Sequence, residues 1–320
     1  MYNIGIDLGG TNIAAAIVDE NGTIIRKGST PTMSERDYSA IIKDMAMLAL
    51  KLLEEEGIDI DDIHSVGVGS PGTPDPENGI IVYANNLRFH NTPIRQEMKK
   101  YIDKPIYLGN DANVAAFGEY ECGTGLECNN LVAITLGTGV GGGIVIDGKI
   151  ISGSFNGGAE LGHVSINYNG ITCTCGRKGC WEQYSSASAL IRDAKEAATN
   201  NPQSKLNELV DGDLSKMNAK IPFDAALEGD EVADKVIKNY IKYLAIGIAN
   251  VINVFQPEIV VLGGGVSAQR DNLIKPLEKE VINEIYGGKN AFKTKIKVAK
   301  LGNDAGIIGA AMLYKIYEKV

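Results

Sequence analysis

The sequence predicts an α/β protein built from two related lobes. Short apolar runs, typical of buried strands, alternate with longer segments whose apolar residues recur at helical spacing. One segment also occurs twice, because residues 4–18 align without a gap on residues 132–146. The chain has 320 residues, of which 44% are hydrophobic, so it is long enough to bury the cores of two domains.

The first lobe opens with a meander of three predicted strands. Tyr2–Asp7 is short and apolar and leads into a glycine turn, and Ile13–Val18 supplies the second strand. Asn21-Gly22 is a strong hairpin signal, so a third strand is expected to begin at Ile24. The opening unit is therefore predicted to be an antiparallel meander.

The second copy of this meander marks the second lobe. In the alignment of the two copies, Asp7-Leu8-Gly9 falls on Thr135-Leu136-Gly137, and Asn21-Gly22 has a counterpart in Asp147-Gly148. The two copies are interpreted as descendants of one ancestral unit. We expect residues 1–118 plus 303–320 to form a smaller N-terminal lobe, and residues 119–302 to form a larger, more helical C-terminal lobe.

The other expected elements follow from apolar periodicity and from the glycines that bound them. The last of them is a helix that should pack back on the first lobe. In chain order they are a helix over 41–53, strands at 66–69 and 105–108, helices over 111–122 and 231–255, a strand over 258–262 and a helix over 305–317.

Charge and hydropathy exclude several classes of partner. The chain carries 31 basic and 40 acidic residues, and its net charge of -9 repels nucleic acids and anionic lipid surfaces. No apolar run approaches the roughly 20 residues needed to cross a bilayer, and the N-terminus does not resemble a signal segment. We therefore expect a cytoplasmic protein that binds neither nucleic acid nor membranes.

Three of the five cysteines are crowded into one short segment that also follows a histidine. Cys173, Cys175 and Cys180 come after His163 and complete a donor set that suits a tetrahedral zinc ion. Four protein ligands leave no open position, so such a zinc would be structural. The alternative is that these are free core thiols and an ordinary polar histidine. Cys122 and Cys128 lie outside the pattern and have no predicted role.

Glycine-rich turns are the next notable feature. Gly67–Gly72, Gly137–Gly142 and Gly263–Ala268 match a loose GxGxxG or GxGxxA pattern, but Gly137–Gly142 runs into a strand, where a dinucleotide site needs a helix. No GxxxxGK[ST] element is present, which excludes a P-loop. A hydride-transfer enzyme is therefore disfavoured.

Two hairpin turns remain as candidates for phosphate binding. Gly9-Gly10-Thr11 and Gly137-Thr138-Gly139 occupy corresponding places in the two copies, and each offers backbone N–H groups without an obstructing side chain. Asp7 directly precedes the first turn, where its carboxylate could hold a magnesium ion, directly or through water. The alternative for each turn alone is a tight β-turn without a ligand. Their paired occurrence favours the phosphate-binding interpretation.

Asp111 is the candidate general base. It follows the apolar segment Pro105–Leu108 within Gly109-Asn110-Asp111-Ala112-Asn113, so its carboxylate should project from a strand end where a helix begins. The alternative is a helix N-cap, which is a common role of aspartate.

Together these motifs resemble the nucleotide site of the actin, hexokinase and sugar kinase superfamily, and within it the ROK family of repressors and sugar kinases. The resemblance rests on Asp7–Thr11, Leu136–Gly139 and Gly263–Ser267, and extends from Ile4 to about Ala311. It implies two ribonuclease H-like lobes of the actin-type ATPase, with a cleft between them. The residues that it implies at ATP and its magnesium are Asp7, Gly9, Gly10, Thr11, Asn12, Thr138, Gly139, Gly264 and Gly265.

The same resemblance implies a sugar pocket beside a zinc loop. ROK proteins carry GH followed by CxCGxxGCxE, which this sequence matches, and their NDxN aspartate, here Asp111, deprotonates the sugar hydroxyl. One departure is Arg88-Phe89, where glycine and tryptophan are often found. The resemblance therefore does not predict this wall of the pocket. The residues implied at the sugar are Gly72, Asn86, Asn110, Asp111, Glu160, His163 and Glu182. For Glu160 and Glu182 the alternative is a solvated surface carboxylate.

The function expected from this resemblance is ATP-dependent phosphorylation of a hexose, with glucose as the first choice. N-acetylglucosamine, N-acetylmannosamine, mannose and fructose remain alternative substrates, and polyphosphate remains an alternative donor. Two hypotheses come from other classes. A sugar-sensing repressor is disfavoured by the negative charge and by a first strand that begins near the start of the sequence. A silent sugar-binding protein is disfavoured by the presence of both Asp7 and Asp111. The resemblance also implies a homodimer or homotetramer.

Overall fold

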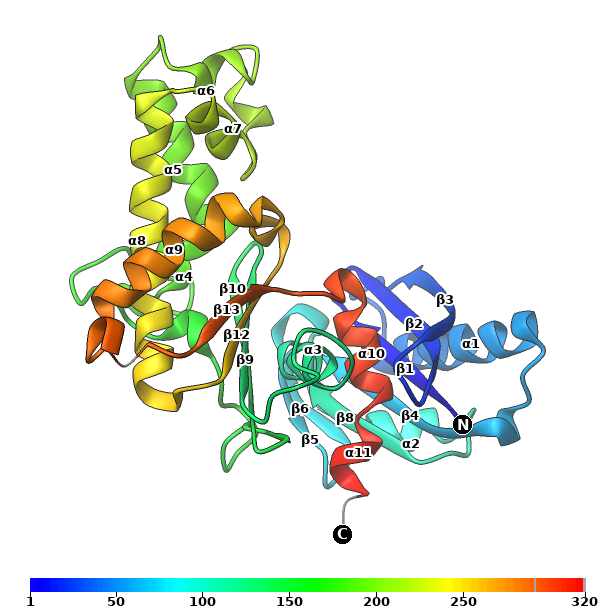
Figure 1. Cartoon of the computed structure of the whole chain (residues 1–320). Helices are drawn as coiled ribbons and strands as arrows, with labels where there is room; N and C mark the ends of the chain where they lie inside the picture. Colours follow the sequence, from blue (N-terminus) through cyan, green and yellow to red (C-terminus); the bar gives the residue numbers. More distant parts are fainter. Residues whose placement is uncertain (291, 319–320) are drawn as a thin grey trace. The chain divides into compact units, whose positions relative to one another are not determined.

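The computed structural model describes residues 1–290 and 292–318 and divides the chain into two compact units. Unit 1 comprises Met1–Leu131, Gly143–Ala159 and Lys300–Val320, and unit 2 comprises Val132–Gly142 and Glu160–Ala299. Figure 1 shows the helices and strands of each unit. Among the described residues, no helix is long and apolar enough to cross a membrane.

The first sheet belongs to unit 1 and has the strand order β3-β2-β1-β4-β8. Strands β1, β2 and β3 form the predicted antiparallel meander, while β4 and β8 join β1 in parallel. Its strands are β1 (Tyr2–Leu8), β2 (Asn12–Asp19), β3 (Ile24–Pro31), β4 (Ile63–Ser70) and β8 (Ile106–Asn110).

The second sheet has the order β11-β10-β9-β12-β13. Three strands that follow one another in the chain again stand beside two later ones, which is the order of the first sheet. The predicted duplication is thus confirmed at the level of topology. Its strands are β9 (Leu131–Leu136), β10 (Val140–Ile146), β11 (Lys149–Ile150), β12 (Ile259–Gly263) and β13 (Lys295–Val298). The chain passes between the two units within β9, after Leu131, and again within β10, after Gly142.

Helices cover both faces of the first sheet because side chains alternate across its strands. Ile13, Ala15 and Ile17 of β2 join the core beneath α1 (Tyr38–Glu56) and α2 (Ile94–Met98), whereas Ala16 and Val18 join the core beneath α3 (Asp111–Cys122) and α10 (Ala305–Ala311). The closing segment therefore packs on the N-terminal sheet, as predicted.

Glycines in two neighbouring strands bring α10 close to the sheet. A Cβ at Gly5 would overlap the carbonyl of Ile307, and a Cβ at Gly67 would overlap the carbonyl of Ala310. Side chains at these positions would push the helix away. Glycine at both positions therefore lets the backbone of α10 approach β1 and β4 closely.

Two expectations for unit 1 need correction. The predicted continuous helix over 305–317 is interrupted, because α10 ends at Ala311 and α11 begins at Tyr314. Between them the amide of Leu313 donates to the carbonyl of Ala310, which is three residues earlier. A hydrogen bond of an α-helix spans four residues, so the backbone is wound more tightly here. The sequence reasoning also missed a three-stranded sheet of β5 (Thr73–Asp75), β6 (Ile80–Ala84) and β7 (Phe89–Thr92), whose strands of three to five residues are too short for a clear periodic signal.

Unit 2 carries most of the remaining helices. Figure 1 shows α8 and α9 beside each other. The predicted helix over 231–255 is confirmed by α8, which Asp230 caps by accepting hydrogen bonds from the amides of Val232 and Ala233. The helices are α4 (Glu182–Ser185), α5 (Ala187–Asn200), α6 (Lys205–Glu208), α7 (Ile221–Leu227), α8 (Glu231–Phe255) and α9 (Asp271–Glu284).

Candidate active site

Asp7 and Asp111 lie at the same edge of the first sheet. In the parallel pairs β1·β4 and β4·β8, Asp7 stands opposite Gly69, and Gly69 stands opposite Gly109. Parallel strands place their carboxyl ends at one edge, which is where open α/β sheets carry their ligand sites. Asp111 follows Gly109 by two residues and is therefore at this edge too.

Burial raises the pKa of both carboxyls. Burial, aided by the negative charge of Asp111, raises the pKa of Asp7 to about 6. Burial also raises the pKa of Asp111, although hydrogen bonds from nearby amides oppose this rise. The edge of the sheet thus carries an electronegative pair that a divalent cation would stabilise.

The raised pKa of Asp7 predicts a pH-dependent loss of stability. Its folded-state pKa of about 6 lies above the ordinary value of 3.8. Ionisation of Asp7 therefore destabilises the folded state, and the free energy of unfolding falls as the pH rises through about 6. We expect the ligand-free Asp7→Asn variant, without magnesium, to be about 2 kcal/mol more stable than the native protein at pH 8, and about 1 kcal/mol or less more stable at pH 4.5. Scanning calorimetry at the two pH values measures the difference.

An exposed aspartate supplies the control for this measurement. Hydrogen bonds from Ser39 hold the pKa of Asp37 below its ordinary value, which is the opposite direction from Asp7. Asp37→Asn should therefore bring no gain at pH 8. Equal melting temperatures of Asp7→Asn and the native protein at both pH values would contradict the buried, repelled carboxylate.

The interpretation of Asp111 as a helix cap is wrong, because its neighbour fills that position. Asn110 is the N-cap of α3, and its Oδ1 accepts hydrogen bonds from the amides of Ala112 (3.1 Å) and Asn113 (3.2 Å). Asp111 is the first residue of the helix. The Nδ2 of Asn110 donates to the carbonyl of Gly72 at 3.1 Å, which links two residues predicted at the sugar.

The first glycine turn is closed by its own backbone and by Thr32. The amide of Gly9 bonds the carbonyl of Asn12 at 2.9 Å, and the hydroxyl of Thr32 donates to the carbonyl of Gly9 at 2.7 Å. Thr11 and Asn12 are exposed, so the turn presents polar groups to solvent. A Cβ at Gly10 would come within 3.3 Å of Nδ2 of Asn86, which places a predicted sugar residue beside a predicted phosphate turn.

Gly306 was missed by the sequence reasoning. A Cβ at this position would lie 2.8 Å from Oδ2 of Asp7, so glycine leaves the carboxylate its space at the start of α10. The only signal in the sequence is a glycine in the first turn of a helix, which is too common to be informative. Thr32 gave no signal because it lies 23 residues from Gly9 in the chain.

In unit 2 the second glycine turn lies against the glycines that follow β12. The turn closes through a bond from the amide of Gly137 to the carbonyl of Gly139 at 3.1 Å, and Thr138 is exposed. Gly264 has a φ of +80° and approaches the backbone of Leu136 so closely that a Cβ would overlap it. Space around Gly265 is open. The predicted nucleotide residues of unit 2 are thus neighbours.

The carboxylates predicted at the sugar differ in their surroundings. Glu160 is exposed just before the 3-10 turn Leu161–His163. Glu182 begins α4 and is half-buried, and its Oε2 accepts a hydrogen bond from the amide of Val140 at 3.1 Å. The interpretation as a solvated surface carboxylate therefore fails for Glu182.

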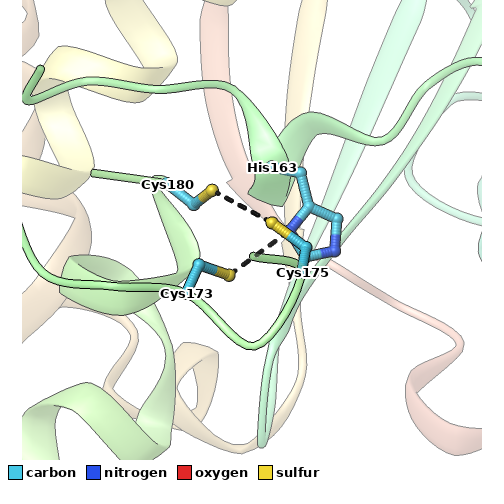
Figure 2. A group of neighbouring side chains, drawn as sticks. All are labelled: His163, Cys173, Cys175 and Cys180. Carbon is cyan, nitrogen blue, oxygen red and sulfur yellow. Dashed lines mark hydrogen bonds between the residues drawn. The ribbon is translucent and has the colours of Figure 1, made fainter. Parts of the chain in front are cut away.

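His163 and three cysteines converge in unit 2 (Figure 2). Their donor atoms all lie within 4.8 Å of one another. The Sγ atoms of Cys175 and Cys180 are 3.6 Å apart, and Sγ of Cys173 is 3.7 Å from Nδ1 of His163. A tetrahedron of sulfurs bound to zinc has edges of about 3.8 Å, so the cluster fits this ion. The second ring nitrogen of His163 points away from the thiols in Figure 2.

The loop around these donors needs glycine at two positions. Gly176 and Gly179 have φ values of +86° and +74°, which other residues rarely adopt. In the metal-free cluster, burial opposes ionisation of Cys173, but hydrogen bonds from neighbouring thiols and His163 lower its pKa to about 7. A thiol that ionises this readily suits metal binding.

Comparison with known proteins gives consistent matches over the whole chain. The sequence model of the ROK family matches residues 3–316. The glucokinase of Thermotoga maritima is 38% identical over 98% of this chain and 96% of its own length, and that of Streptomyces coelicolor is 36% identical over 97% and 96%. The structure of a ROK family glucokinase from Streptomyces griseus, in complex with glucose and AMPPNP, is 34% identical, covers 98% of this chain and 99% of its own, and superposes with a TM-score of 0.81.

Proposed function

The chain belongs to the ROK family, and from this membership we propose that it transfers the terminal phosphate of ATP to glucose. Its fold is that of the actin-like ATPases, as the resemblance predicted. The observation that carries the proposal is the shared strand edge of unit 1, which brings Asp111 and the glycine turn after Asp7 to one place. The glucokinase relatives and the solved complex with glucose and an ATP analogue support the choice of substrates.

Asp111 acts as the general base in this reaction. It takes the proton of the attacking hydroxyl while the hydroxyl oxygen bonds the γ-phosphorus and the bond to the leaving ADP oxygen breaks. Its raised pKa makes it a stronger base than an ordinary aspartate. Asn110 and Gly72, already joined by a hydrogen bond, position the sugar beside it.

Backbone groups and Asp7 provide for the phosphates. The turns at Gly9–Asn12 and Thr138–Gly139 offer N–H groups, which compensates for the acidic character of the chain. Asp7 would hold magnesium, directly or through water, and the ion would neutralise charge on the phosphates.

His163, Cys173, Cys175 and Cys180 form a structural zinc site. Four protein donors would complete the tetrahedral shell of the ion, which would leave no position for a substrate. The ring nitrogen of His163 that faces away from the thiols is free to bind a sugar hydroxyl, together with Glu160 and Glu182.

A sugar panel tests the substrate assignment. We expect coupled ADP release with magnesium ATP to show the highest kcat/KM for glucose, about tenfold or more above mannose, fructose, N-acetylglucosamine and N-acetylmannosamine, since a pocket contact discriminates by a few kcal/mol. A higher value for another sugar would overturn the choice of glucose. Absence of ADP release with every sugar, from folded protein with bound metal, would overturn the kinase itself in favour of a silent sugar-binding protein.

A further inference from the structure

The second glycine turn, residues 137–140, is held by three contacts from outside its own strands. Oε2 of Glu182 accepts a hydrogen bond from the amide of Val140 at 3.1 Å. The amide of Ala187, at the start of α5, donates to the carbonyl of Gly137 at 2.8 Å. Gly162 lies so close that a Cβ there would overlap the carbonyl of Val140. The shape of the turn thus depends on other segments of unit 2.

The side chain of Glu182 also packs directly against Gly139 of this turn. A Cβ at Gly139 would overlap its Oε2 and would lie 3.2 Å from its Cδ and 3.9 Å from its Cγ. No atom of another residue is nearer than these, so the space above Gly139 is taken by this carboxylate alone. A side chain at residue 139 would therefore have to displace the carboxylate of Glu182.

Two of the three contacts come from residues beside the metal-binding donors. Gly162 precedes His163, and Glu182 follows Cys180 by two residues. Oε1 of Glu182 lies 4.0 Å from Sγ of Cys173, and the neighbouring Gln183 donates to the same sulfur at 3.7 Å. The side chain of Glu182 thus spans the distance from the cysteine cluster to the glycine turn.

We propose that Glu182 is a positioning residue for the nucleotide, because its carboxylate holds the turn at residues 137–140 in the shape that receives the phosphates of ATP. This role rests on the proposed function and is separate from any contact of Glu182 with the sugar. It also makes the cysteine cluster a support for the nucleotide site, since the cluster fixes the segment from which Glu182 projects. Loss of the carboxylate should therefore weaken nucleotide binding even when no sugar is present.

A double-mutant cycle tests this role. Binding of magnesium AMPPNP, without sugar, is measured by calorimetry for the native protein, Gly139→Ala, Glu182→Ala and the double variant. We expect each single change to weaken binding about tenfold, as loss of a hydrogen bond to a charged group does. In the double variant the added methyl group meets no carboxylate, so its affinity should match that of Glu182→Ala within about twofold.

Two further variants separate the role of the carboxylate from other effects. Glu182→Gln keeps an oxygen acceptor and its volume, so it should bind the nucleotide more tightly than Glu182→Ala, and Gly139→Ala should still weaken binding in that background. Glu284→Ala removes an exposed glutamate at the end of α9 and should leave affinity unchanged. Equal zinc content in all variants shows that the change does not act through loss of metal.

The outcomes are distinct. If Gly139→Ala weakens binding by the same factor with and without Glu182, the methyl group blocks the phosphates directly and the proposed role of Glu182 is wrong. If the native protein binds no AMPPNP, the proposed function fails instead. Hydrogen exchange gives a readout that needs no nucleotide, since the amide of Val140 should exchange at least tenfold faster in Glu182→Ala or Gly139→Ala if the bond holds the turn. Unchanged exchange in Gly139→Ala would overturn the proposal even where Glu182→Ala does not fold.

Discussion

Replacement of Asp111 by asparagine is expected to lower kcat about 1,000-fold while sugar and nucleotide affinities stay within about threefold. The amide has nearly the shape of the carboxylate but cannot take the proton of the attacking hydroxyl. The cap of α3 should survive the change because Asn110 accepts the amides of Ala112 and Asn113. The amide of Ala112 also donates to Oδ1 of Asp111, and asparagine keeps an oxygen acceptor at that place. Steady-state kinetics and sugar binding by calorimetry measure the two effects separately.

The pH dependence of the native enzyme is part of the same prediction. Because burial raises the pKa of Asp111, kcat/KM should fall on acidification with an inflection above the ordinary aspartate value of 3.8. Asp111→Asn should lose this inflection. Retention of kcat within tenfold in the variant would remove Asp111 from the role of base.

Loss of the cysteine cluster is expected to have the second large effect. The Cys173→Ser, Cys180→Ser double variant should lose its zinc and melt at a temperature lower by ten degrees or more, because a structural zinc contributes about 10 kcal/mol or more to the folding of its loop. Both sulfurs are buried, so the loop would also lose its packed centre. Elemental analysis and scanning calorimetry measure the two quantities.

Cys122→Ser provides the matched control for this effect. Cys122 is a half-buried thiol outside the cluster, and burial raises its pKa to about 11. This variant should keep about one zinc per chain. A native protein that carries no zinc, or a double variant that keeps it, would contradict the assignment of the four donors.

Elements with a long periodic signal could be predicted from the sequence. The helices over 111–122 and 231–255 have the predicted bounds, because a strand or loop with clear capping residues precedes each of them. The duplicated meander could also be predicted, since two copies of one pattern support each other. The break between α10 and α11 could not, because it depends on a local change of backbone hydrogen bonding that leaves the apolar pattern intact.

In the candidate site, too, the local motifs could be predicted from the sequence, whereas the tertiary contacts could not. The cluster of His163 with three cysteines followed from spacing, and the structure brings its donors together. The bond between Glu182 and the amide of Val140 joins residues that are 42 positions apart. No sequence pattern predicts such a contact, because almost every residue has a backbone amide that could donate the bond. The close approach of Gly306 to Asp7 was hidden for the same reason.

Direct observation of the product tests the central claim, which is that this chain phosphorylates glucose with ATP. Phosphorus NMR of the protein with glucose and magnesium ATP should show glucose 6-phosphate and ADP growing in equal amounts, with no ADP formed when glucose is omitted and almost none with Asp111→Asn. Formation of ADP without a sugar phosphate, or no conversion by protein that is folded and carries zinc, would contradict it.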